Sequence, residues 1–213
     1  MTSGRAAALT FVAALSLASP AAADGAAGPS PTGIRVGVRT GFALPAGQAF
    51  NGSGALSDTI RGYVPLRLDL GVRIARHFYV GGLVQRAAIV PDACSGELSC
   101  TGSNTRFGVL VGLHLRPAAF ADPWVAVGLG YEVLSVSRTT TTTRLDLDAK
   151  GLELVDVELG LDLRPFAGLR VGPAVSTSIG RYTSISLNGH STSDFNTVMH
   201  GWVLFGLRGA WDL

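Results

Sequence analysis

The stretch VDVELGLDLRPFAGLRVGPAV, from Val155 to Val175, alternates apolar residues with charged or small ones over two consecutive segments. From Val155 to Leu163 every second residue is valine or leucine, and the residues between them are Asp156, Glu158, Gly160 and Asp162. After a tight Pro-Phe-Ala-Gly sequence at 165–168 the alternation resumes. Successive side chains of a β-strand point to opposite faces, so this period of two predicts two strands, each with an apolar and a polar face.

The same alternation recurs in eight segments of about ten residues, the length that a tilted strand needs to cross a bilayer. They are residues 34–44, 65–75, 78–87, 106–116, 124–134, 155–164, 169–176 and 202–213. Short gaps at 76–77, 117–123 and 165–168 alternate with long polar gaps at 45–64, 88–105, 135–150 and 180–200. Short turns at one end and long loops at the other predict an all-β fold, an eight-stranded antiparallel up-and-down transmembrane β-barrel over residues 34–213. The threonine-rich run 138–144 is predicted to extend the strand before it above the membrane.

Composition also points towards lipid, because 47% of the 213 residues are hydrophobic and only 15% are charged. The one long apolar run, 6–18, follows Arg5 and precedes an Ala-x-Ala site, which predicts a secretory signal peptide over residues 1–23. The alternative, a membrane anchor, needs a run of about 20 residues. Residues 24–33 are then a short linker. A net charge of +2 without a basic cluster argues against a nucleic-acid partner.

Alternation alone does not say which face points inward, since a soluble barrel such as a lipocalin would turn its apolar face to the core. The polar rows, however, are rich in glycine, which makes room in a narrow lumen, and their positive and negative charges nearly balance. The apolar rows carry no charge in mid-segment, where one would cost about 2–4 kcal/mol in a bilayer. We therefore predict lipid outside and a paired charge network in the lumen. The network comprises Arg35, Arg39, Arg67, Asp69, Arg73, Arg106, Glu132, Asp156, Glu158, Asp162, Arg164, Arg170, Arg208 and Asp212, with Arg116 in the same rows.

In this architecture the chain resembles the small outer-membrane β-barrel family of the OmpA/OmpX type, over nearly all of the mature sequence. The most specific part of the resemblance is the last strand, in which Phe205, Leu207, Trp211 and Leu213 alternate up to the final residue. The resemblance implies that the outer-membrane assembly machinery reads this strand as a C-terminal signal during insertion, although most members end in phenylalanine where Leu213 stands. It also implies location in the outer membrane of a Gram-negative cell, with membrane lipid as a partner.

Two cysteines, Cys94 and Cys100, lie in one long gap. In an exported protein such a pair most often forms a disulfide, and we predict one here. A metal site is the alternative, but a lone pair separated by five residues with no nearby histidine argues against it.

Candidate catalytic groups are sparse. His190, Ser191 and Asp194 lie in the last long gap, but neighbours in a loop seldom have the geometry of an activated serine. His77 is assigned to a solvated turn, and His114 and His200 to hydrogen-bonded packing positions in the lumen. The carboxylates Asp156, Glu158 and Asp162 lie on one face among arginines, where salt bridges explain them more simply than acid–base chemistry. We predict no cofactor.

The function predicted from these observations is that of a non-enzymatic outer-membrane barrel, with a side-chain-filled lumen and four surface loops in a structural or surface-contact role. A wide pore is not expected, because aqueous channels belong to barrels of about 16 strands. Two alternatives remain open: an outer-membrane enzyme acting on lipid, and a small-solute channel. The sequence identifies no surface partner.

Overall fold

The computed structural model describes residues 32–213 except 51–52, 59, 92–98, 141 and 193–198. The predicted signal peptide, most of the predicted linker, Cys94 and Asp194 lie outside the described residues. Among those that are described, no helix is long and apolar enough to cross a membrane.

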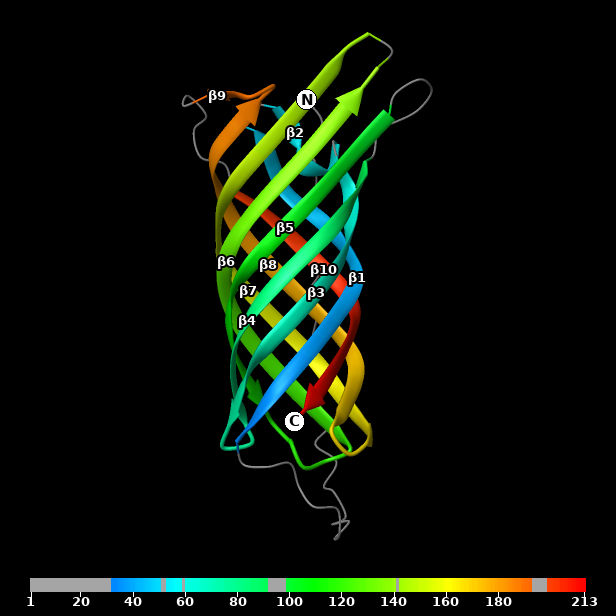
Figure 1. Ribbon diagram of the computed structural model, residues 1–213, viewed down its shortest axis with the longest axis vertical. Coiled ribbons are helices and arrows are strands. Elements are labelled where there is room, and N and C mark those ends of the chain that lie inside the picture. Colours follow the sequence, from blue (N-terminus) through cyan, green and yellow to red (C-terminus); the bar gives the residue numbers. More distant parts are fainter. Residues whose placement is uncertain (1–31, 51–52, 59, 92–98, 141, 193–198) are drawn as a thin grey trace, which may run out of the picture.

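Eight long antiparallel strands close into a barrel, as the sequence predicts, because β10 pairs with both β8 and β1 (Figure 1). Three short elements lie at one end of the barrel: the strands β2 (Ser53–Ala55) and β9 (His190–Thr192) and the 3-10 helix η1 (Leu56–Asp58). The barrel strands, in order of pairing, are β1 (Gly33–Phe50), β3 (Ile60–Ile74), β4 (Phe78–Pro91), β5 (Ser99–His114), β6 (Ala121–Thr139), β7 (Arg144–Phe166), β8 (Leu169–Leu187) and β10 (Met199–Asp212).

The two ends of the barrel differ in the length of their connections. At the end where the C-terminus lies, the turn end, β3–β4 and β7–β8 are joined by tight turns (Figure 1). Ala75, Arg76 and Gly168 adopt positive φ values of 51°, 67° and 83° there, a conformation that tight hairpin turns require. At the opposite end, the loop end, the strands continue well beyond the predicted segments.

The continuation is largest in β6 and β7. Residues 135–150, predicted as a long gap, are mostly a two-stranded hairpin that turns between Thr139 and Arg144, so the predicted loop is much shorter than its sequence span. The Thr140 N–H donates to the Thr143 carbonyl across this turn, and the Thr143 N–H donates to the Thr140 hydroxyl. β6 runs to Thr139 and β7 begins at Arg144, so only the first two residues of the threonine-rich run extend the strand as predicted, and the rest make the turn and begin the next strand.

The two faces of the sheet are chemically opposite. Outward side chains are leucine, valine and phenylalanine and are well exposed, as at Leu70 (61%), Val109 (56%) and Leu207 (65%). Inward side chains are buried and include seven arginines and seven aspartates or glutamates. The lumen of the loop end holds instead an apolar cluster in which Trp202 and Tyr63 are in ring contact, with centroids 4.6 Å apart. The sequence did not predict this cluster.

Candidate functional site

The charged interior of the barrel is the most distinctive feature of the structure, and one strand supplies many of its carboxylates. Four buried carboxylates lie on one strand, β7: Glu153, Asp156, Glu158 and Asp162. Their arginine partners come from four strands that do not pair with β7, namely β1, β3, β5 and β10. They are Arg39, Arg67, Arg106 and Arg208. Arg39 is the register partner of both Arg67 and Arg208, so three arginines stand side by side. Each would repel the others without the acidic strand facing them.

Ion pairs cross the lumen between β7 and these four strands. Glu158 accepts from Arg39 and from Arg67, and Arg67 also binds Asp69 on its own strand at 2.6 Å. Arg106 binds Glu153 through its Nε at 2.7 Å and Asp156 through Nη2 at 3.2 Å. Arg208 lies 3.5 Å from Asp162. Buried charges must be paired and hydrogen-bonded to be tolerated, and these contacts supply that pairing.

A second cluster fills the turn end. Asp212 accepts from Arg35 at 2.6 Å and from Arg170 at 2.8 Å, and Arg73 also pairs with it. Arg170 reaches from Asp212 to Asp122, 2.8 Å away, and His114 Nδ1 is the same distance from Asp122. The turn end of the lumen is therefore closed by three linked arginines and two carboxylates.

Towards the loop end, Glu132 is held by four polar neighbours. Asn104 Nδ2, Trp202 Nε1 and the Tyr182 hydroxyl donate to it at 2.5–3.2 Å, and His200 Nε2 lies 3.1 Å away. His200 stacks on Tyr182 with ring centroids 3.8 Å apart. This carboxylate is buried, and packing residues contact both of its oxygens.

Two carboxylates of the charge network were not predicted from the sequence pattern. Glu153 shares the parity of the lipid-facing Val155, yet it is buried against Arg106. A β-bulge explains the reversal: Leu154 and Val155 both point outward, opposite Leu129, and the alternation changes phase between them. A bulge of this kind adds one residue to one strand and re-aims the side chains beyond it.

Asp122 was missed for a different reason, because it lies in the gap predicted between two segments. It begins the inward row of β6 instead, and it also accepts from the backbone N–H of Arg116. Arg164 was predicted in the charge network, and the structure places it differently. It is partly exposed and donates to the carbonyl of Pro117 at 2.5 Å, and among the described residues it has no carboxylate partner.

Of the candidate catalytic groups in the last long gap, the structure describes only the side chain of His190, which is exposed at the start of β9. Asp194 and the Ser191 side chain lie outside the described part of the chain. No three metal-ligating side chains are grouped within that described part. Cys100 lies in β5 opposite Arg138, while Cys94 lies outside the described residues, so the disulfide stays a prediction.

The four residues predicted as a C-terminal assembly signal lie on the outward side of the last barrel strand. Phe205, Leu207, Trp211 and Leu213 are 56%, 65%, 43% and 70% exposed. Their alternation is unbroken along β10, which closes the barrel against β1.

Solved structures with this architecture are known, although neither a protein-family model nor a curated protein sequence matches the chain. A major outer membrane protein from Thermus thermophilus superposes with a TM-score of 0.51 and 11% identity, covering 84% of this chain and 99% of that one. OprG from Pseudomonas aeruginosa gives 0.48 and 14%, covering 85% and 97%, and Neisserial surface protein A gives 0.46 and 13%, covering 85% and 98%. Sequence identities this low show similarity of fold alone. The chain has the fold of the small eight-stranded outer-membrane β-barrels.

Proposed function

We propose that this chain is a non-enzymatic protein of the Gram-negative outer membrane that works through its external hairpins, with a lumen that does not conduct. The observation that supports the closed lumen is the set of ion pairs from β7 across to β1, β3 and β5. An apolar cluster lies beyond them at the loop end. In this proposal the signal peptide exports the chain, and β10 is read by the assembly machinery.

The lipid-facing side supports membrane insertion. From Leu66 to Val72 on β3, every outward residue is leucine or valine and is 42–61% exposed. An apolar surface that continues around the barrel is far larger than a soluble monomer exposes. In a bilayer, lipid hydrocarbon would cover the same surface.

The hairpin of β6 and β7 supports a contact role, because it is the longest projection from the loop end and it is internally braced (Figure 1). Ser135 donates to Asp148 and Ser137 to Asp146, both at 2.6 Å. The bond from Ser137, with another from Arg144, holds the pKa of Asp146 below its usual value. Such a braced element presents a surface without the entropy cost of ordering a loop on binding.

The closed lumen predicts an electrical result. Protein reconstituted in planar lipid bilayers is expected to show no discrete conductance steps, because charged pairs and packed apolar side chains fill the interior. A 16-stranded porin is the positive control for the assay. Reproducible steps from protein that is folded by heat-modifiable gel mobility would contradict the closed lumen and favour the small-solute channel.

The orientation of the barrel is testable through its only lysine. Lys150 is exposed on β7, on the loop-end side of the lipid-facing Leu152. Short turns face the periplasm in outer-membrane barrels. We therefore expect a membrane-impermeant amine reagent to label Lys150 on intact cells, and Lys150→Arg to abolish that label. Labelling only after the cells are broken would overturn the orientation.

A further inference from the structure

Arginine side chains gather at the turn end of the lumen, around the turn that joins β5 to β6. Arg164 at the end of β7 and Arg170 at the start of β8 both donate to the Pro117 carbonyl, at 2.5 and 2.9 Å. Arg116 directly precedes this proline, and its backbone N–H donates to Asp122, which also accepts from Arg170. Two guanidinium groups thus meet at one uncharged oxygen, with a third arginine next to it in the chain. We call Arg116, Arg164 and Arg170 the mouth cluster.

Positive charge exceeds negative charge at this end of the lumen. The arginines there are Arg35, Arg73, Arg116, Arg164, Arg170 and Arg208. The carboxylates there, among the described residues, are Asp122, Asp162 and Asp212, and each is already bound by arginine. Because an arginine can only donate, the contact of Arg35 with His114 Nε2 requires an uncharged imidazole. The excess is therefore three positive charges, or two if a terminal carboxylate at Leu213 is counted.

Two members of the mouth cluster are accessible to water. Arg116 and Arg164 are partly exposed, and neither has a carboxylate partner within the described ranges. Arg170, in contrast, is 1% exposed and is fixed by Asp122 and Asp212, each 2.8 Å away. The cluster therefore combines one buried, fixed cation with two cations that can turn towards a ligand.

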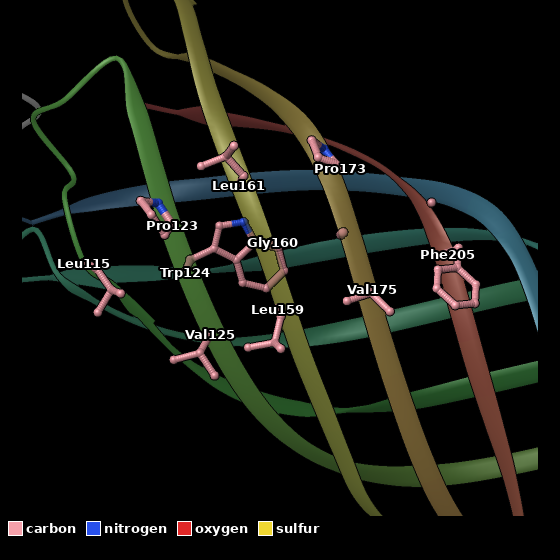
Figure 2. Close-up of a pocket in the computed structure, with 12 residues that line it drawn as sticks. Leu115, Pro123, Trp124, Val125, Leu159, Gly160, Leu161, Pro173, Val175 and Phe205 are labelled. Carbon is pink, nitrogen blue, oxygen red and sulfur yellow. The ribbon is translucent and has the colours of Figure 1, made fainter. Parts of the chain in front are cut away.

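The wall of the barrel outside this cluster is apolar. A groove of about 620 Å³ on the outward side of the same strands is lined by apolar side chains and glycines, among them Leu115 and Leu161 (Figure 2). The pairing of β7 with β8 is interrupted beside it, between Gly160 and Leu163, and none of the residues that line the groove is charged. An anion that approaches this end is therefore attracted to the mouth of the lumen and not to the wall.

The size of the charge excess favours a phosphate group as the ligand. A phosphate with one ester bond or none carries about 1.5–2 negative charges near neutral pH, whereas a carboxylate carries one. The planar N–H groups of arginine bind phosphate oxygens in pairs. Arg170 is held in place before any ligand arrives, which reduces the free-energy cost of ordering the site.

We propose that the mouth cluster binds a soluble phosphate dianion, either inorganic phosphate or the phosphate of a small ester. Arg116 and Arg164 contact its oxygens from the water side, and Arg170 supplies a fixed positive charge behind them. In the orientation proposed above the site opens to the periplasm, but the binding itself depends neither on that orientation nor on the external hairpins. One end of the lumen then binds a ligand, in addition to the part that its ion pairs have in stability.

Isothermal titration calorimetry with inorganic phosphate tests the site, with folded protein in dodecyl maltoside near neutral pH and at constant ionic strength. Wild-type protein is expected to show saturable binding of one phosphate, and sodium chloride to show none. Arg164→Gln should weaken the binding about tenfold, because a charge-assisted contact is lost. Arg61→Gln is the matched control, since it removes the same charge from an exposed arginine of β3 at the loop end, and it should bind as wild type does.

Heat-modifiable gel mobility shows whether each variant is folded, so that loss of the barrel is distinguished from loss of the site. Arg116→Gln replaces Arg164→Gln if the latter does not fold. The same titration with 1-palmitoyl-2-oleoyl-phosphatidylglycerol added to the micelles separates a soluble ligand from a lipid headgroup, and phosphate binding should be unchanged. Displacement of phosphate by this lipid, no saturable binding to the wild type, or equal weakening by Arg164→Gln and Arg61→Gln would overturn the proposal.

Discussion

Substitution of Glu158 by glutamine is expected to lower the free energy of unfolding of the barrel by about 3–5 kcal/mol. Glu158 is 2% exposed and accepts from both Arg39 and Arg67. Glutamine keeps the size of the side chain and one accepting oxygen but removes the charge. Arg67 keeps the carboxylate of Asp69, whereas Arg39 then has no carboxylate partner among the described residues and has the Ser176 hydroxyl 3.3 Å away. The measurement is reversible urea unfolding in lipid vesicles, followed by tryptophan fluorescence and gel mobility.

Asp146→Asn is the matched control, because it also removes one carboxylate from β7 that pairs with an arginine. Asp146 and its partner Arg144 are both solvent-exposed, and exposed ion pairs contribute little to stability. No measurable change is expected from it. Arg39→Met combined with Glu158→Gln should be destabilised by less than the sum of the two single changes, since the cation and anion are lost together. Additive effects would show that the cross-lumen pair is not coupled.

The alternating rows were sufficient to predict the number of strands, closure and which face of the sheet points outward. They also predicted most of the arginines and carboxylates that the structure buries together, because a period of two survives wherever a strand is regular. Glu153 shows where this reasoning ends. Its inward position depends on one extra residue at Leu154–Val155. The apolar residues change there from even to odd positions, a signal of the bulge that counting from Val155 onward leaves out.

The ends of strands were less predictable for a related reason. At the loop end the strands no longer keep the apolar-outside, polar-inside pattern, and Leu134 and Val136 point inward into the apolar cluster there. At the turn end, Asp122 reads as part of a turn although its backbone already belongs to β6. Arg164 continues the parity of the inward row, yet it ends on the carbonyl of Pro117 because the strand is leaving the lumen there.

Substitution of Gly160 by valine is expected to be the second severe change, because it removes the space that Trp124 occupies. Even the Cβ alone would lie 2.5 Å from the indole. Overpacking of this kind costs about 1–3 kcal/mol. Moving the indole also breaks its 2.9 Å hydrogen bond to Asp162 and leaves part of a buried carboxylate unsatisfied, which costs about 1–3 kcal/mol more. The folded, heat-modifiable fraction after refolding in vesicles should fall, and the urea midpoint with it.

Gly82→Val controls for the loss of a glycine from a strand, because Gly82 faces lipid on β4 and its Cβ would meet only the Gly108 carbonyl, 3.7 Å away. Little change is expected there, since β-branched residues suit exposed strand positions. Trp124→Leu restores the space and should partly offset Gly160→Val. The double variant is therefore expected to lose less stability than the two single changes added together. If the losses simply add, the collision with the indole is not the cause, and a backbone effect at the interrupted β7–β8 pairing takes its place.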